Sequence, residues 1–152
     1  MSNAVSQLFS WIILGSKVVG GILATLTFVL YLNQDKLLYM PNPPGFPKTP
    51  KENPPGFTSP AHWSVHGKSL NQPSSKSIPF EEHFIETSDG KKIHVWLMLH
   101  SDSQNRPTLL YFHGNAGNMG FRLKNAAEMF AKVKMNILMM DYRGYGAYKM
   151  LT

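Results

Sequence analysis

The sequence predicts an α/β fold preceded by a transmembrane helix, and three observations lead to this prediction. An apolar run of about 25 residues, Leu8 to Leu32, lies near the start of the chain. Further on, Asp89-Gly90 separates two β-rich runs, and a strand-helix-strand pattern follows. A helix that joins two parallel strands is the building unit of α/β sheets. We therefore expect the truncated start of such a sheet: a hairpin, a strand, a helix and a strand.

The apolar run has the length and composition of a membrane span. It contains one charged residue, Lys17, and as a helix it would extend roughly 37 Å, enough to cross a bilayer. Trp11 and Tyr31 lie near its ends, where aromatic side chains meet the membrane interfaces. A cleaved signal peptide is the alternative, which the length of the run and the absence of a preceding basic residue disfavour. We expect residues 1–34 to anchor the protein in a membrane as a single pass, in contact with membrane lipid; the organelle stays open.

The composition limits the classes of partner and cofactor. The net charge of +6 is spread along the chain without a basic helix, which argues against nucleic-acid binding. The chain has no cysteine and no phosphate-binding glycine motif, and we expect no cofactor. His62 and His66 are four residues apart, but no third ligand accompanies them, so we expect ordinary loop residues and no metal site.

A proline-rich segment separates the apolar run from the predicted sheet. All but one of the 11 prolines lie between Pro41 and Pro79, and such a stretch cannot hold a long helix. We expect residues 35–79 to form a linker with extended or irregular backbone. Residues 80–152 then form a partial α/β domain.

Residues 80–112 carry the pattern of three strands. The runs from Phe80 to Thr87 and from Lys92 to His100 flank the Asp-Gly turn and predict a hairpin. In the second run, apolar side chains alternate with a mixed set that includes His94, so we expect His94 and His100 to be ordinary strand residues. The continuous apolar run from Thr108 to Phe112 predicts a strand that is covered on both faces.

The next segment has helical periodicity and ends in another strand. Asn118 is a candidate N-cap, and apolar residues recur on one helical face after it: Leu123, Ala126, Ala127, Phe130 and Val133. The sequence NILMMDY, Asn136 to Tyr142, predicts a buried strand that Arg143-Gly144-Tyr145-Gly146 terminates. The helix makes the connection between two parallel strands.

The sequence FHGNAGN, Phe112 to Asn118, lies between the predicted strand and helix. Unpaired backbone N–H groups and the helix dipole at such a junction favour negative charge. A phosphate or the oxyanion of an acyl-transfer intermediate would fit, and the phosphate motifs are absent. The alternative without a ligand is a tight turn.

The sequences YFHGNAGN and DYRGYG, in this order and at this spacing, resemble the α/β-hydrolase superfamily. With the apolar N-terminal run, the resemblance is greatest to the membrane-anchored branch that contains α/β-hydrolase domain-containing protein thirteen and the bud-emergence proteins. It implies a serine hydrolase of esters or thioesters, with depalmitoylation of proteins suggested for related members. It also assigns the backbone N–H of Asn115 to the oxyanion hole, with His113, Gly114 and Gly117 shaping the loop. Asp141 and Arg143 would brace neighbouring loops.

The chain departs from the family pattern because it has no G-x-S-x-G nucleophile elbow and no acid and histidine after one. We therefore expect the chain by itself to be inactive: the N-terminal part of a membrane-anchored serine hydrolase, whose acyl substrate is bound only by a longer form. The alternative is a non-catalytic, membrane-anchored truncated isoform that binds lipid or a partner. The family sheet order also predicts one bare edge on the strand Thr108 to Phe112, which favours aggregation.

Overall fold

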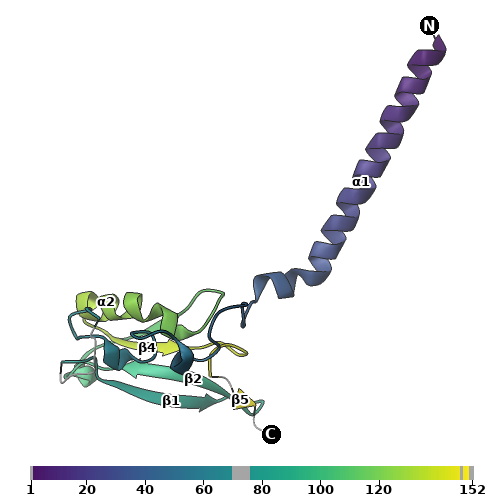
Figure 1. Ribbon diagram of the computed structural model, residues 1–152. Coiled ribbons are helices and arrows are strands. Elements are labelled where there is room, and N and C mark those ends of the chain that lie inside the picture. The colour runs from purple at the N-terminus through teal and green to yellow at the C-terminus, as the bar shows by residue number, and fades with distance from the viewer. Residues whose placement is uncertain (1, 70–75, 148, 151–152) are drawn as a thin grey trace. The chain divides into compact units, whose positions relative to one another are not determined.

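The computed structural model describes residues 2–69, 76–147 and 149–150. The chain divides into two compact units, Met1–Tyr39 and Met40–Thr152, and each is described by itself. Figure 1 shows the helix of the first unit and the sheet of the second. Small parts of the predicted linker and of the predicted sheet domain, residues 70–75, 148 and 151–152, lie outside the described residues.

The first unit consists of one long helix, α1 (Ser2–Leu38). Its apolar side chains are exposed on every side, and it is long and apolar enough to cross a membrane. Two of its hydroxyl groups donate to carbonyl oxygens one turn earlier: Ser16 to Ile12 at 2.9 Å and Thr25 to Gly21 at 2.8 Å. These polar groups therefore need no water, which suits a lipid surrounding. The predicted long apolar N-terminal helix is confirmed.

The second unit is built on a mixed β-sheet. Its strands are β1 (Phe80–Glu86), β2 (Lys91–Met98), β3 (Thr108–Phe112), β4 (Asn136–Met140) and the short β5 (Lys149–Met150). The sheet order is β1-β2-β4-β3, in which β2 is antiparallel to both neighbours and β3 is parallel to β4. The helix α2 (Leu123–Val133) connects β3 to β4. The predicted order of hairpin, strand, helix and strand is confirmed, whereas β5, which pairs with the first residues of β2, was not predicted.

The turn between β1 and β2 follows the Asp-Gly signal. The Gly90 amide donates to the Thr87 carbonyl oxygen at 2.9 Å, and the Thr87 amide donates to that of Lys91 at 2.8 Å. Gly90 has a φ of 72°, a conformation that a glycine adopts without a Cβ penalty. The three-residue loop with a left-handed glycine fixes the register of the hairpin.

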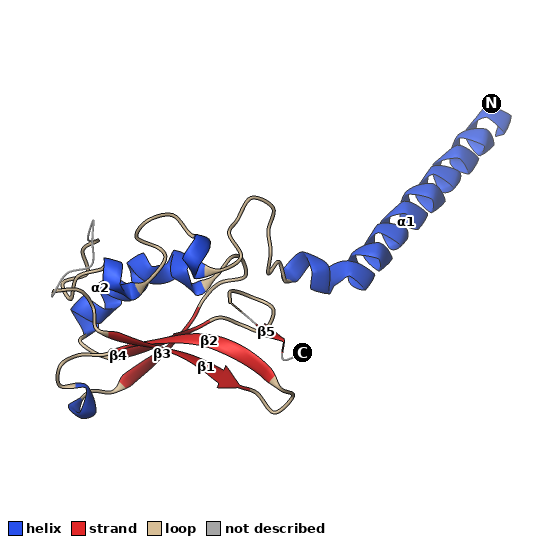
Figure 2. Cartoon of the chain, turned by 60° about the horizontal axis from the view of Figure 1, so that its bottom comes forward, coloured by secondary structure: helices blue, strands red, loops and turns tan. Residues whose placement is uncertain are grey.

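One face of the sheet carries the core. Helix α2 lies over this face (Figure 2), and its Leu123 and Phe130 are fully buried. The strands contribute alternate side chains, which the register places side by side: Trp96 of β2 is the partner of Met139 of β4. Both are fully buried in the same cluster, so the mixed side of β2 faces the core.

The other, more open face of the sheet exposes apolar side chains on its edge strands β1 and β3, whereas Val95 of the inner strand β2 is buried there. Leu110 and Phe112 of β3 are 46% and 57% exposed, and Ile85 of β1 is 49% exposed. The prediction that β3 is covered on both faces is wrong for this chain, because α2 and the proline-rich segment pack on the same side. The predicted bare edge is present: among the described residues, β3 pairs only with β4.

The segment predicted to be a linker belongs to the same compact unit as the sheet from Met40 onward. Its backbone is irregular apart from two short 3-10 turns, Pro50–Glu52 and Pro60–His62. Trp63 is buried in the core cluster, and its indole N–H donates to the Gly56 carbonyl oxygen at 2.6 Å. Prolines prevent a helix here, but they do not prevent the large apolar side chains from packing on the sheet.

Candidate functional site

The four residues predicted to form an oxyanion loop, His113, Gly114, Asn115 and Gly117, all follow β3 directly. The α-helix starts later than predicted. A 3-10 turn, Met119–Arg122, separates the loop from α2, and Asn118 caps this turn by accepting the Gly120 amide at 3.0 Å. The first turn of α2 therefore does not adjoin the loop, and a helix dipole contributes less there than the sequence suggested.

Gly117 gives the loop its shape. Its φ of +71° lies in the left-handed region, and a Cβ at this position would approach the Phe121 ring to 3.1 Å. Both features favour glycine over any residue with a side chain.

The His113 side chain faces the protein interior. Its Nδ1 lies 2.6 Å from the Gly114 carbonyl oxygen, and because a carbonyl only accepts, Nδ1 carries a proton. Its Nε2 lies 3.4 Å from Asp141 Oδ1. The ring also packs against the ring of Tyr142, at a centroid distance of 4.4 Å, and the Tyr142 hydroxyl donates to the His113 carbonyl oxygen at 2.5 Å. These contacts hold the histidine as a support of the loop.

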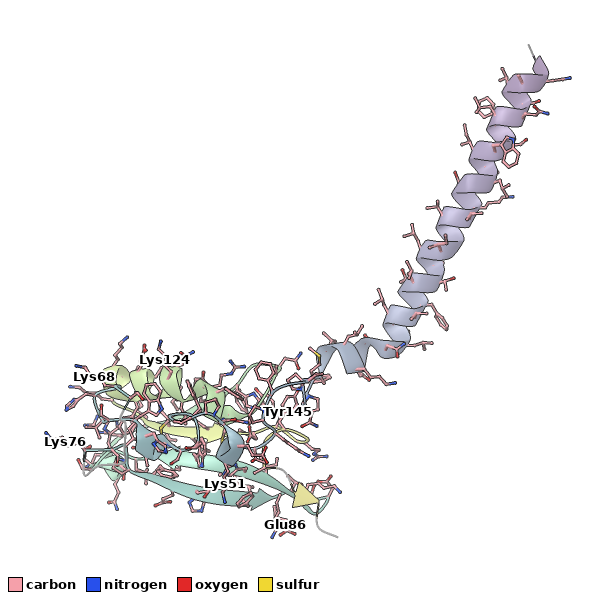
Figure 3. All side chains as sticks on the ribbon, in the orientation of Figure 1. Lys51, Lys68, Lys76, Glu86, Lys124 and Tyr145 are labelled. Atoms are coloured by element: carbon pink, nitrogen blue, oxygen red, sulfur yellow. The ribbon has the colours of Figure 1, made fainter. Side chains whose placement is uncertain are left out.

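Asn115 lies at the exposed tip of the same loop. The Tyr145 hydroxyl (labelled in Figure 3) lies 3.0 Å from the Asn115 carbonyl oxygen and 2.9 Å from its side-chain oxygen. Arg122 Nη2 donates to the neighbouring Ala116 carbonyl oxygen at 3.2 Å. Within the described part of the chain, the backbone N–H of Asn115 makes no hydrogen bond. The loop thus fixes its carbonyl groups and leaves this N–H available to an acceptor.

Asp141 links the loop to the end of β4. It is 1% exposed, and its Oδ1 accepts the Met119 amide at 2.6 Å. Burial raises the pKa of this carboxyl, but the contacts with His113, His94 and Met119 outweigh burial and lower it below 3.8. A Cβ on Gly146 would lie 1.7 Å from Asp141 Oδ2, so glycine is required there. The predicted bracing role of Asp141 is therefore seen in its contacts.

Arg143, which was also predicted to hold neighbouring loops in place, contacts the hairpin turn and not the oxyanion loop. Its Nη1 and Nη2 lie 2.9 Å and 3.2 Å from the two carboxylate oxygens of Asp89 in the hairpin turn. Both side chains are exposed, so this ion pair adds little stability. It connects the loop after β4 to the β1–β2 turn.

Sequence reasoning missed a buried pair of amides behind the loop. Asn53 Nδ2 donates to Asn118 Oδ1 at 2.8 Å, and Asn118 Nδ2 donates to Asn53 Oδ1 at 2.9 Å. Asn118 is fully buried, and its Nδ2 also lies 3.2 Å from the Pro47 carbonyl oxygen. The proline-rich segment is thereby bonded to the residue that ends the loop. The helix-cap pattern identified Asn118, but nothing in the sequence marked its partner.

His94 also differs from its expected role as an ordinary strand residue. The side chain is buried, its Nε2 lies 2.6 Å from Glu82 Oε1, and its Nδ1 lies 3.7 Å from Asp141 Oδ2. The hairpin register pairs His94 with Phe84, whose ring stacks on the imidazole at 4.9 Å. Two carboxylates therefore flank one imidazole, and the alternation of β1 and β2 was the available signal for this arrangement.

The described part of the chain has no cluster of side chains that is placed to hold a metal ion: no three or more His, Asp or Glu side chains gather in this way. Lys51, Lys68 and Lys124 come from three separate segments of the second unit (Figure 3).

Comparison with known proteins identifies relatives of the chain. It is 37% identical over 118 residues to protein bem46 of Schizosaccharomyces pombe, and the alignment covers 77% of this chain and 33% of that protein. It is 32% identical over 128 residues to α/β-hydrolase domain-containing protein WAV2 of Arabidopsis thaliana, over 84% of this chain and 35% of that protein. The uncharacterized membrane protein YNL320W of Saccharomyces cerevisiae is 30% identical over 77 residues, 51% of this chain and 26% of that protein.

No protein-family model matches the sequence. Among solved structures, an esterase of Pyrococcus furiosus, Pf2001, aligns with 49% of this chain and 28% of its own, at a TM-score of 0.42 and 22% identity. The chain spans about a third of the length of the curated relatives bem46 and WAV2. By these sequence similarities, together with the hairpin-strand-helix-strand order of its sheet, the chain belongs to the α/β-hydrolase superfamily, of which it carries an N-terminal portion.

Proposed function

We propose that the chain supplies the oxyanion loop and the membrane anchor of a serine hydrolase that acts on esters or thioesters. The observation that carries the proposal is the backbone N–H of Asn115: the residue is exposed, and this N–H makes no hydrogen bond within the described residues. In acyl transfer, the substrate carbonyl oxygen becomes negative, and an N–H fixed in position stabilises that charge.

The surroundings of Asn115 favour this role because they hold the loop before a substrate arrives. Tyr145 bonds the Asn115 carbonyl group, Tyr142 bonds that of His113, and Arg122 bonds that of Ala116. A donor that is already in place needs no reorganisation when charge develops, and this is the main source of oxyanion stabilisation in enzymes. Gly114 is exposed, and a Cβ there would have Arg122 Nη2 as its nearest neighbour at 3.8 Å, so this part of the loop leaves space for a substrate.

In this proposal, the nucleophile, its general base and the acid that orients the base come from a longer protein and not from these 152 residues. None of the serines of the chain lies in a G-x-S-x-G motif, and both ring nitrogens of His113 face protein groups. An oxyanion donor without a nucleophile has no covalent intermediate to stabilise. The isolated chain is therefore inactive.

Helix α1 is the proposed single membrane span. Its length and composition support this, and the relative YNL320W is named as a membrane protein. An enzyme anchored in this way meets acyl chains at the membrane surface, which favours lipid-modified proteins or lipids as substrates. Thioester cleavage in protein depalmitoylation is the proposed reaction.

The test uses the isolated chain and a full-length protein that contains it, both purified in a maltoside detergent. The isolated chain is expected to show neither p-nitrophenyl ester turnover nor labelling by a fluorophosphonate. The full-length protein is expected to turn over the ester and to be labelled by the fluorophosphonate. Asn115→Pro should reduce its kcat by about 10²- to 10³-fold, which is the effect of losing one oxyanion donor.

Asn115→Ala is the matched control, because it removes the side chain but keeps the backbone N–H. It should retain most of the activity. Equal losses in the two variants, or ester turnover by the isolated chain that Asn115→Pro does not change, would contradict the proposed role. A cellular protein that is no longer than this chain and takes up no fluorophosphonate would favour the non-catalytic alternative.

A further inference from the structure

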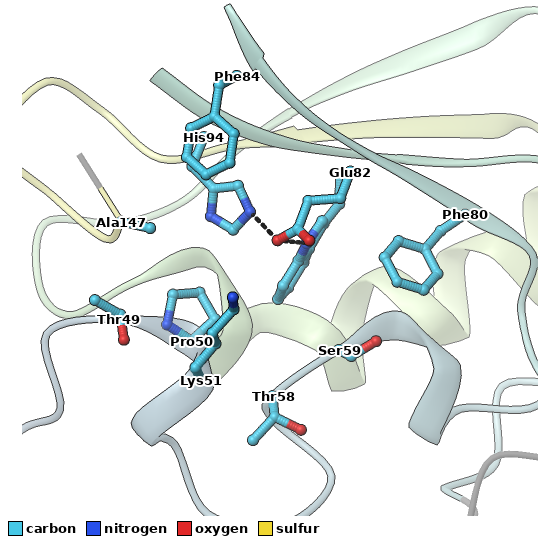
Figure 4. Close-up of a pocket in the computed structure, with 11 residues that line it drawn as sticks. Thr49, Pro50, Lys51, Thr58, Ser59, Phe80, Glu82, Phe84, His94 and Ala147 are labelled. Carbon is cyan, nitrogen blue, oxygen red and sulfur yellow. Dashed lines mark hydrogen bonds and ion pairs between the residues drawn. The ribbon is translucent and has the colours of Figure 1, made fainter. Parts of the chain in front are cut away.

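A pocket of about 470 Å³ lies between the hairpin and the proline-rich segment, and no residue of the oxyanion loop lines it. Figure 4 shows its two walls. Phe80, Glu82 and Phe84 of β1, with His94 and Trp96 of β2, form one wall, and Thr49–Lys51 with Thr58 and Ser59 form the other. The volume lies in the range of small-molecule sites.

Aromatic rings make up most of the strand wall. The rings of Phe84 and His94 stack at 4.9 Å, those of His94 and Trp96 meet edge to face at 5.4 Å, and those of Phe80 and Trp96 do so at 6.3 Å. The faces of aromatic rings carry partial negative charge and attract organic cations.

Glu82 supplies a full negative charge beside these rings. Its Oε1 receives the contacts from His94 Nε2 at 2.6 Å and Trp96 Nε1 at 3.4 Å. Among the described residues, Oε2 makes no hydrogen bond, and the side chain is 41% exposed. Behind His94 lies a second carboxylate, Asp141. Lys51 lines the opposite wall, and it forms no ion pair with Glu82 in the described structure.

We propose that this pocket binds an organic ammonium group that carries alkyl substituents, as in a quaternary ammonium. The proposal does not depend on the proposed hydrolase function. A hard metal ion would need several oxygen ligands, and the pocket offers a single carboxylate. A bare ammonium ion would lose strong hydration that aromatic walls do not replace, whereas alkyl groups bury favourably against them.

Choline is the probe, added to the full chain in a maltoside detergent, which has no choline headgroup. The readout is the indole N–H signal of Trp96, observed by NMR, because this N–H contacts Glu82 directly. We expect a saturable shift of this signal. The Trp63 indole, bonded to Gly56, reports in the same spectrum that the fold is intact. The neutral analogue 3,3-dimethylbutanol has the same shape without the charge and should bind at least about tenfold more weakly.

Glu82→Gln should weaken choline binding by about tenfold or more, because it removes the charge and keeps a similar shape. Glu81→Gln is the matched control: it makes the same charge change one residue earlier, on the opposite face of β1, and should leave binding unchanged. Lys51→Met removes the opposing positive charge, and binding should be equal or tighter.

The ammonium group could belong to a soluble molecule or to a lipid. Comparing the affinity for phosphocholine with the affinity for monomeric dihexanoyl phosphatidylcholine distinguishes the two. Tighter binding of the lipid identifies a membrane headgroup, and equal binding identifies a soluble ligand; either result supports the site. No shift of the Trp96 signal at tens of millimolar choline overturns the proposal, as does equal binding of choline and its neutral analogue. Equal effects of Glu82→Gln and Glu81→Gln also overturn it.

Discussion

The two faces of the sheet differ in how much of their apolar surface the rest of the chain covers. On one face, Trp96 and Met139 are fully buried beneath α2 and the proline-rich segment, in one cluster with Phe130 of α2. On the other face, Leu110 and Phe112 of β3 are about half exposed, although their composition is as apolar as that of the buried side. Apolar composition therefore does not by itself determine burial.

Several buried polar groups lie on the covered side of the sheet, at the end of β4 and in the loop after β3. Asp141, Asn118 and His113 connect the end of β4 to the loop after β3. Buried polar groups cost free energy unless they are paired, so mutations of these groups should lower the free energy of unfolding substantially. Mutations at the exposed edge-strand positions of the open face should be nearly neutral. Four substitutions test this contrast, each measured by urea unfolding of the full chain in a maltoside detergent.

The largest effect is expected for Gly146→Ala. The new Cβ would overlap Asp141 Oδ2 at 1.7 Å, and the residue has a φ of +59°, so the carboxylate must leave its position. We expect a loss of about 3 kcal/mol or more in the free energy of unfolding. Gly144→Ala is the control, because its φ of +86° brings the same kind of strain with no atom within 4 Å. It should cost about 1 kcal/mol, and similar values for the two variants would contradict the close-contact explanation.

Asp141→Asn should cost about 2 kcal/mol at neutral pH, because an amide does not replace the buried carboxylate in its contacts with His113 and His94. The sign of the pH dependence follows from the lowered pKa of Asp141. Its contribution is fully present above 3.8, the pKa of an ordinary aspartate, and is lost as the pH falls below 3.8 through the folded-state pKa. The asparagine variant should lack this part of the acid destabilisation.

Other carboxyls also titrate in this range, so the comparison must be made between variants. Thr87 lowers the pKa of Asp89, and Arg106 lowers that of Asp102, through hydrogen bonds on exposed side chains. Glu82 faces the same histidine as Asp141. The difference between wild type and Asp141→Asn isolates Asp141, and identical acid unfolding curves for the two would show that its charge does not contribute.

Asn118→Ala should cost about 2 kcal/mol, because it leaves the buried Asn53 amide and the Gly120 N–H without their partner. Asn125→Ala, at an exposed position of α2, is the control and should be neutral or slightly stabilising. A small effect of Asn118→Ala would mean that water replaces the amide pair.

The smallest effect is expected for Leu110→Thr on the open face, within about 0.5 kcal/mol of wild type. Its neighbour Leu109 packs against the core cluster, and Leu109→Thr should cost about 1 to 2 kcal/mol. Light scattering should also show less association for Leu110→Thr, since it reduces the exposed apolar surface. Equal costs for the two substitutions would mean that the open face is covered in solution.

The sequence was sufficient to predict the local elements. Asp89-Gly90 identified the hairpin, and the helical spacing identified the buried face of α2 from Leu123 to Phe130, because turn chemistry and periodicity are local properties. Val133, predicted to lie on the same face, is 51% exposed at the end of the helix. The two glycine-containing motifs also identified the loop that contains Asn115. Whether that loop binds an oxyanion stays a prediction.

Long-range contacts were not predictable. The pairing of Asn53 with Asn118 and the placement of His94 between Glu82 and Asp141 depend on how segments meet in three dimensions. The exposure of Leu110 and Phe112 was missed for the same reason, since a strand pattern does not specify what packs on each face. The start of α2 at Leu123 instead of directly after Asn118 reflects the 3-10 turn that the cap introduces.

The reciprocal amide bond between Asn53 and Asn118 joins positions that are 65 residues apart in the chain. Closing a loop of this length costs chain entropy, so we expect docking of the proline-rich segment to be a late step in folding. The same bond couples the segment to the loop. Proteolytic cleavage between Thr49 and Phe57 should therefore become faster whenever Asn118 is displaced, and its rate would report on the position of the loop.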